Sequence, residues 1–179
     1  MILSKQSDEA LFLLFHQEGD VKGYEEIYER YFSTLAKYAS WTTGDKEKGK
    51  DFAQKVLLKL FERPELFDAK QNLKTWLFTI LRNQIKNEWR NENNRQKILD
   101  QIPFTHETPT EHIDNKNRVH EVLKALESLS ENHKEVFLLK YSNNLSINEI
   151  SHALKVSEGT VKSRIFYAIK SIRNTIKNI

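Results

Sequence analysis

Apolar residues recur along most of the chain at the three- and four-residue spacing of amphipathic helices, and the alternation that marks β-strands is absent. In the segment 21–42, for example, aromatic and aliphatic residues fall at positions 24, 27, 28, 31, 35 and 38. Glycines at 19 and 44 and the proline at 64 provide stop signals. The first half is therefore predicted to form helices at about 8–17, 21–42, 46–62 and 73–94, with 63–74 mostly a loop.

The periodic pattern stops after about residue 95 and resumes at about 117. The intervening segment holds Pro103, Pro109 and several threonines, and residues 99–115 contain four acids and no base. Such a segment has little to bury and is predicted to be a flexible acidic linker. Beyond it, helices are predicted at about 117–128, 131–141, 147–154 and 158–176.

These patterns predict an all-α protein with two small helical domains joined by a flexible acidic linker. The first domain is placed at 1–95, the linker at 96–116, and a four-helix domain containing a helix-turn-helix at 117–179. A length of 179 residues suits two small domains of this kind.

The amino-acid composition excludes several classes of functional site. The chain has no cysteine, so disulfides, thiolate zinc sites and thiol redox switches are excluded. Its six histidines are scattered without metal-ligand spacing, and no Gly-rich phosphate loop or nucleophile–base motif is present. We therefore expect no metal, no cofactor and no enzymatic activity.

No apolar run is long enough to cross a membrane. The N-terminal stretch contains acids and lacks a small-residue cleavage site, so a signal peptide is not expected either. With the absence of cysteine, this favours a cytoplasmic protein with no direct membrane insertion.

Charge is distributed unevenly, although the formal net charge is only +3. Residues 157–179 carry five bases against one acid, and 82–97 carry five bases against two acids. Any one such patch is usually a solvated helix face. Two patches, each on a helix with an apolar back, favour a nucleic-acid partner.

The segment 145–173 has the features of a helix-turn-helix. Ser146 and Glu149 form a predicted capping box, and Ser157 is a suitable N-cap for the last helix. The connecting turn is short and contains Val156, an apolar residue of the kind that packs beneath such turns. This arrangement places a helix in the DNA major groove, although an ordinary amphipathic surface helix remains the alternative.

At 100° per residue the last helix has two distinct sides. The apolar side, predicted to be core, carries Val161, Ile165, Ala168, Ile169, Ile172 and Ile176. The other side carries hydroxyl and basic side chains that suit base edges and phosphates, with Lys162 and Arg164 at its flanks.

The string LSINEISHALKVSEGTVKSRIFYAIKSIR (145–173) resembles the promoter −35 module of bacterial RNA polymerase sigma factors, especially the extracytoplasmic-function (ECF) group. The family often has Gly where this chain has Lys155, and basic residues near Tyr167 and Ile169. The −35 contacts implied by the resemblance and the wheel are Ser157, Thr160, Lys162, Ser163, Arg164, Tyr167 and Lys170.

The string NLKTWLFTILRN (72–83) and the residues after it resemble the −10 module of the same family. There, a base flipped from the melted strand is held beside such a helix. The implied −10 contacts are Asn72, Trp76, Arg82, Asn83, Lys86, Asn87 and Arg90. For Trp76 a role purely in the core is the alternative, and Trp89 is expected to pack.

The string DFAQKVLLKLF (51–61) resembles the family's polymerase-docking segment, which binds the clamp helices of the largest subunit. The implied docking residues are Asp51, Gln54, Lys55 and Leu58. Lys55 stands where the family usually has Glu, and a plain solvated helix face is the alternative for this segment.

The resemblance implies a sigma factor that binds core RNA polymerase, including the flap of the second-largest subunit, and directs initiation at double-stranded and melted promoter DNA. It also implies an anti-sigma factor as a partner, and a linker that either threads the RNA exit path or simply tethers the domains. Rival interpretations are a stand-alone helix-turn-helix regulator and an enzyme acting on nucleic acid.

Overall fold

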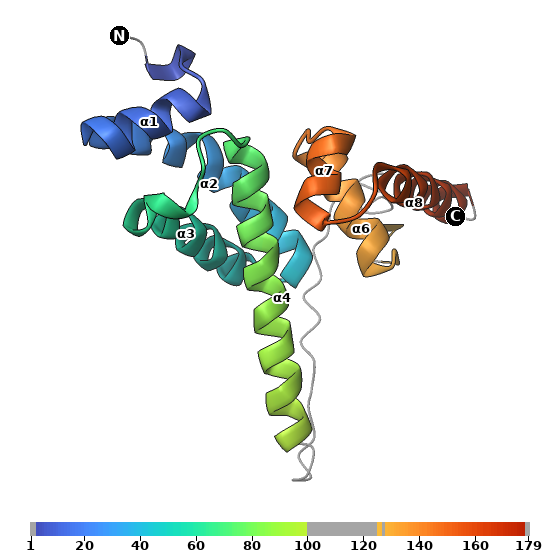
Figure 1. Cartoon of the computed structure of the whole chain (residues 1–179). Helices are drawn as coiled ribbons and strands as arrows, with labels where there is room; N and C mark the ends of the chain where they lie inside the picture. Colours follow the sequence, from blue (N-terminus) through green and yellow to red (C-terminus); the bar gives the residue numbers. More distant parts are fainter. Residues whose placement is uncertain (1–2, 100–124, 127, 178–179) are drawn as a thin grey trace.

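The computed structural model describes residues 3–99, 125–126 and 128–177. Within these ranges every regular element is a helix or a helical turn, and no strand is present (Figure 1). The prediction of an all-α protein is confirmed. Most of the predicted helix at 117–128, and the linker from residue 100 to 116, lie outside the described residues.

Four helices form the N-terminal half: α1 (Asp8–Glu18), α2 (Val21–Thr43), α3 (Lys46–Glu62) and α4 (Leu73–Leu99). Short 3₁₀ turns, η1 (Leu3–Lys5) and η2 (Pro64–Leu66), precede α1 and follow α3. The first three helices begin where predicted and end within one residue of the predicted ends. Helix α4 runs five residues beyond the predicted end at 94, into the segment assigned to the linker, because no Pro or Gly interrupts residues 90–99.

Local signals account for the helix ends. Gly19 and Gly44 take left-handed backbone angles, with φ of 70° and 74°, and end α1 and α2 as predicted. The Asp45 carboxylate accepts hydrogen bonds from the backbone N–H groups of Glu47 and Lys48 at 2.8 and 3.0 Å, and so starts α3.

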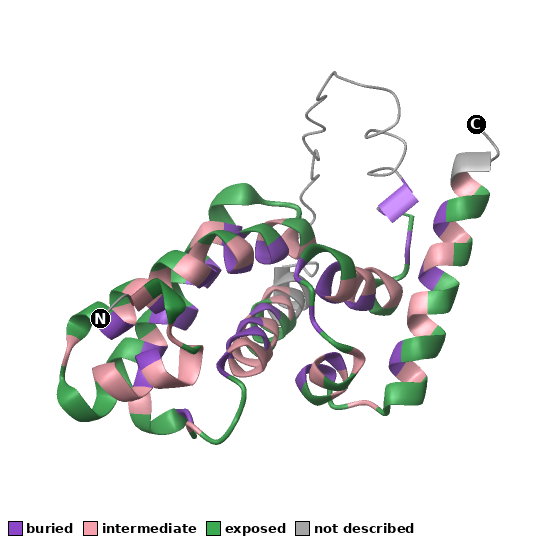
Figure 2. Cartoon of the chain, turned by 90° about the horizontal axis from the view of Figure 1, so that it is seen from above, coloured by how far each residue is buried: buried purple, intermediate pink, exposed green. Residues whose placement is uncertain are grey.

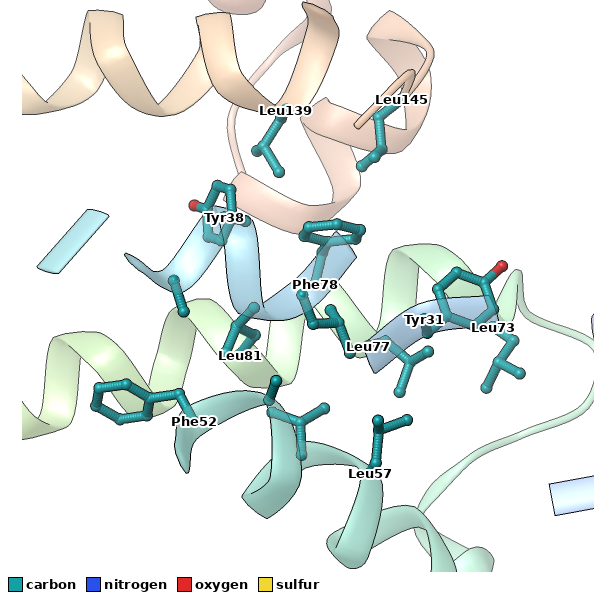
Figure 3. Close-up of a cluster of buried hydrophobic side chains, with 14 of the residues drawn as sticks. Tyr31, Tyr38, Phe52, Leu57, Leu73, Leu77, Phe78, Leu81, Leu139 and Leu145 are labelled. Carbon is teal, nitrogen blue, oxygen red and sulfur yellow. The ribbon is translucent and has the colours of Figure 1, made fainter. Parts of the chain in front are cut away.

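Helices α2 and α3 approach each other closely at Gly49. A β-carbon at this position would lie 2.8 Å from the carbonyl oxygen of Ala36 and would also meet Ser40. Helices α3 and α4 contribute to a hydrophobic core that includes Leu57, Leu77 and Leu81, each fully buried. The core therefore fixes α4 against the rest of the N-terminal half (Figure 3).

The C-terminal half consists of α6 (Glu131–Phe137), the π-helical turn η3 (Leu138–Ser142), α7 (Ile147–Leu154) and α8 (Glu158–Lys177). The starts of α6, α7 and α8 match the predictions, and so does the end of α7. The predicted helix at 131–141 instead changes to π-helical geometry at Leu138. Buried Asn143 ends this turn, since both its backbone N–H (3.1 Å) and its side-chain amide (3.0 Å) donate to the Leu138 carbonyl.

The two halves pack against each other, which the sequence pattern did not predict. Leu139 and Leu145 point from the C-terminal half toward Tyr38 and Phe78 of the N-terminal half, as Figure 3 shows. All four side chains are at most 2 % exposed. A single cluster of buried side chains therefore crosses the boundary between the halves.

Candidate nucleic-acid interface

The turn between α7 and α8 is built by local hydrogen bonds. The predicted capping box is present: Glu149 N–H donates to Ser146 Oγ at 3.1 Å, and Ser146 N–H donates to the Glu149 carboxylate at 2.7 Å. Lys155 ends α7 in the left-handed region at φ 54°, where glycine is favoured. Val156 is partly buried against the core, as the turn requires.

Ser157 begins α8, since its Oγ accepts a hydrogen bond from Thr160 N–H at 3.1 Å. Along α8, Val161 and Ala168 are fully buried and Ile172 is 9 % exposed, so buried positions repeat along one side of the helix (Figure 2). Ile165 and Ile169 are partly buried. The predicted apolar side is confirmed at these positions, and the side chain of Ile176 lies outside the described residues.

The predicted −35 residues line the remaining surface of α8. Lys162, Ser163, Tyr167 and Lys170 are exposed, as is Ser157, whereas Thr160 and Arg164 are partly buried. The Lys162 ammonium lies 3.7 Å from the Glu158 carboxylate on the preceding turn. This exposed contact is weak enough to exchange for a phosphate.

Phe166 was missed by the sequence reasoning. It is 61 % exposed and meets Tyr167 edge-on, with ring centroids 5.5 Å apart. Its position, three residues after Ser163 and four before Lys170, puts it on the same surface by helical spacing. The helical spacing alone could have placed Phe166 on this surface. It was overlooked because the surface was defined by hydroxyl and basic side chains, and Phe166 is apolar.

On α4, two predicted −10 residues also have structural roles. Asn72 is the N-cap, because its side-chain oxygen accepts hydrogen bonds from Thr75 N–H at 2.8 Å and Thr75 Oγ1 at 3.0 Å. Trp76 is partly buried and meets Phe67 edge-on at 5.6 Å. Trp76 therefore packs on one side, while Asn72 and Trp76 also line an open cleft of about 580 Å³ whose opposite wall is α7.

Four further −10 candidates form an exposed stripe on α4: Asn83, Lys86, Asn87 and Arg90. One guanidinium N–H of Arg90 donates to the Asn87 side-chain oxygen at 2.6 Å. The stripe presents amide and basic groups to solvent, as a surface that follows a phosphate backbone requires.

Arg82 lies apart from this stripe. Its side chain is only 15 % exposed, and its Nε lies 2.6 Å from the carboxylate of Glu135 on α6, which is 12 % exposed. Tyr38 lies beside this pair, and burial, with the negative charge of Glu135, raises the pKa of its phenol well above the usual range. The structure therefore brings Arg82 into the contact between the halves, which the sequence did not indicate.

The four predicted docking residues, Asp51, Gln54, Lys55 and Leu58, are all exposed on α3. Lys55 Nζ lies 2.6 Å from the Asp51 carboxylate one turn away. Leu58 is 49 % exposed and Phe61, one turn further, is 41 % exposed. The surface thus combines an ion pair with an apolar end, and Phe61 extends it beyond the prediction.

Within the described part of the chain, no group of three or more metal-type side chains comes together. None of the helices in that part is both long and apolar enough to cross a membrane.

Comparison with known proteins identifies both halves. Residues 27–95 match the family model for Sigma-70 region 2, and residues 125–174 match that for Sigma-70 region 4. The chain is 30 % identical over 156 residues to the ECF RNA polymerase sigma factor SigL of Mycobacterium tuberculosis, covering 86 % of this chain and 88 % of SigL. The chain belongs to the ECF sigma factors of RNA polymerase.

As an ECF sigma factor, the protein directs transcription initiation, and sigma factors are non-catalytic initiation factors. SigX of Bacillus subtilis is 25 % identical over 158 residues, covering 84 % of this chain and 81 % of SigX. The sigma factor RpoE of Bartonella quintana, solved with the anti-sigma factor NepR, shares the fold with a TM-score of 0.72 at 24 % identity, covering 87 % of this chain and 98 % of that one.

Proposed function

We propose that this sigma factor divides promoter recognition between its two halves. The exposed side of α8 reads the −35 element in the major groove, and the α4 stripe holds the −10 strand. The α3 surface docks on the clamp helices of the largest polymerase subunit, and the C-terminal half meets the flap of the second-largest subunit. The protein makes no catalytic contribution of its own and acts in the cytoplasm, where the polymerase is.

The observation that carries this proposal is the exposed, amide- and base-rich stripe on α4. Asn83, Lys86, Asn87 and Arg90 follow one side of the helix, while Leu77, Phe78, Leu81 and Ile85 on the other side are buried. A stripe of this composition attracts phosphates and releases counterions when it binds. A stand-alone helix-turn-helix regulator has no need of it.

Melting of the −10 element requires a place for an unstacked base. Flipping a base costs a few kcal/mol, which a pocket and stacking offset. The cleft lined by Asn72 and Trp76 supports a role of this kind, since it offers an indole ring and amide groups on the same helix as the basic stripe.

On α8, hydroxyl groups and lysines suit base edges and phosphates, and Phe166 suits a thymine methyl group. Of the two departures from the family, Tyr167 is exposed on this surface, and Lys155 lies in the turn that leads into α8. We therefore propose that these two positions give the protein a −35 preference of its own.

An anti-sigma factor is the third proposed partner. The solved RpoE and CnrH structures contain the anti-sigma factor NepR and the cytosolic domain of CnrY, respectively. CnrH shares the fold with a TM-score of 0.71 at 18 % identity, covering 97 % of this chain and 99 % of that one.

The test is in vitro transcription with core RNA polymerase on a promoter library. The wild-type protein is expected to give promoter-specific transcripts. The double variant Asn83→Ala/Arg90→Ala is expected to lose open-complex formation but to retain pull-down of core polymerase. Lys162→Ala is expected to weaken −35 binding, since losing one good base contact costs about 1–3 kcal/mol.

Absence of any promoter-specific transcript contradicts the proposal. Loss of polymerase pull-down in the double variant would instead assign the α4 stripe to docking. DNA binding by the wild-type protein without polymerase pull-down would favour the stand-alone regulator.

A further inference from the structure

An open groove lies between the C-terminal part of α2, the start of α3 and Lys134 of α6, and is called the lysine groove below. Its volume of about 660 Å³ is in the range of sites that bind small molecules. The residues that line it belong to neither the promoter surfaces nor the polymerase surface proposed above. The groove is therefore a feature that promoter recognition does not use.

The α2 side of the lysine groove is apolar. Phe32, Ala36 and Trp41 line it at helical spacing. The Phe32 ring stacks on Tyr28 with ring centroids 5.2 Å apart and planes 9° from parallel, so a neighbour supports it. The Trp41 side chain, in contrast, is 36 % exposed. An indole that is open to a groove can accept a flat ring by stacking.

Four lysines surround this apolar side: Lys37 of α2, Lys46 and Lys50 of α3, and Lys134 of α6. Among the described residues, every charged side chain that lines the groove is one of these lysines. Lys50 pairs with the Glu47 carboxylate at 2.8 Å. In the same part of the chain, the other three have no carboxylate within ion-pair distance. The groove therefore concentrates positive charge that the protein does not neutralise there.

The other lining groups narrow the class of ligand. The Ser40 hydroxyl already donates to the Ala36 carbonyl at 2.7 Å, and the lining residues of the described chain include no side-chain amide, carboxylate or guanidinium. The groove thus offers little to read the edge of a base. Lysines bind phosphates as point charges, and four of them exceed what a single carboxylate requires. The combination favours a flat ring that carries several phosphates over a fatty acid.

We propose that the lysine groove binds a nucleoside polyphosphate. The base stacks on Trp41 beside Phe32, and the phosphates contact Lys37, Lys46 and Lys134. Because Lys134 belongs to the C-terminal half and the other groups belong to the N-terminal half, the ligand contacts both halves of the protein. This site does not rest on the proposed promoter contacts.

The first measurement is calorimetric titration of the full chain with ATP, GTP and inorganic triphosphate. ATP and GTP are expected to bind saturably and with similar affinity, one per protein, because the groove stacks a base without reading its edge. Inorganic triphosphate is expected to bind more weakly, since it has no ring to stack. ATP is also expected to raise the midpoint of thermal unfolding, because it binds the folded state.

Variants test the two parts of the site separately. The double variant Lys37→Gln/Lys46→Gln is expected to weaken ATP binding at least about tenfold, since it removes two charged contacts to phosphate. Trp41→Leu keeps an apolar side chain but removes the stacking ring, and is expected to weaken ATP binding about five- to one-hundredfold. Trp41→Phe restores a ring and is expected to recover much of this loss.

Lys22→Gln is the matched control, because it removes an exposed lysine of α2 that lies outside the groove. It is expected to leave ATP binding unchanged. Thermal unfolding of the ligand-free variants checks that each of them is folded.

Four results would overturn the proposal. The first is no saturable binding at millimolar ATP, and the second is ATP binding that the groove variants do not weaken. The third is inorganic triphosphate binding as tightly as ATP, which would show attraction by charge alone. The fourth is tighter binding of another ligand in a Trp41-dependent way: laurate would assign the groove to acyl chains, and single-stranded oligodeoxythymidylate would assign it to promoter DNA.

Discussion

At the scale of single residues, Asn72 combines folding and recognition. Its side-chain oxygen caps α4 through Thr75, and the same residue lines the cleft proposed for an unstacked base. We expect Asn72→Ala to lower the free energy of unfolding by about 0.5–2 kcal/mol, because the cap is lost. Asn72→Asp keeps a capping oxygen but adds a negative charge, so it is expected to preserve stability and weaken binding to −10 DNA.

Denaturant unfolding and open-complex formation measure the two effects separately. Equal promoter activity of Asn72→Asp and the wild-type protein would limit Asn72 to its role as a cap.

Several residue-scale features were readable from the sequence. The capping box of Ser146 and Glu149 and the helix-ending glycines depend on neighbours within a few positions along the chain. The burial of Arg82 was not readable, because its partner Glu135 lies 53 positions away. The resemblance to the −10 module placed Arg82 among the DNA contacts but carried no information about what covers that part of α4.

At the scale of elements, the crossing of α2 and α3 depends on Gly49. Alanine normally favours a helix over glycine by about 1 kcal/mol. Here the added methyl group would collide with the backbone of Ala36 and with Ser40. Forcing an extra methyl group into a packed contact costs about 1–3 kcal/mol, so Gly49→Ala is expected to destabilise the protein in thermal or denaturant unfolding.

Gly159→Ala is the matched control for this prediction. The nearest atom to its β-carbon would be Ser157 Oγ at 3.7 Å, an ordinary contact, so the substitution is expected to be neutral or stabilising. A Gly49→Ala protein as stable as the wild type would show that the two helices can move apart at no cost.

Element boundaries were mostly predictable because their signals are local. The exceptions are informative. Helix α4 continued past residue 94 because nothing in the following residues stops a helix, whereas the helix begun at Glu131 changed to a π-helical turn at Leu138. Leu139 of that turn and Leu145 after it pack against the N-terminal half, and a tertiary requirement of this kind leaves no periodic signal in the sequence.

At the scale of the whole molecule, two separate basic surfaces are proposed to act on one promoter. Each phosphate contact releases counterions, so the affinity of the polymerase-bound protein for promoter DNA is expected to fall linearly with salt on logarithmic axes. Lys86→Gln on α4 and Lys162→Gln on α8 are each expected to reduce that slope by about 1. The double variant is expected to show the sum, since the sites lie on different halves.

Lys22→Gln serves as the control for the salt dependence, because Lys22 is exposed at the start of α2 and belongs to neither proposed surface. A slope that Lys162→Gln leaves unchanged would remove α8 from the phosphate-binding surface.

The sequence by itself determined the helical class, the order of the two halves, the caps and turn of the helix-turn-helix, and the family. These properties follow from periodic burial and from hydrogen bonds between neighbours in the chain, and both leave a pattern in the order of residues. Only the tertiary structure decided that the halves are closed on each other and that Glu135 holds Arg82. These depend on which distant surfaces meet, and therefore on packing and desolvation across the whole molecule.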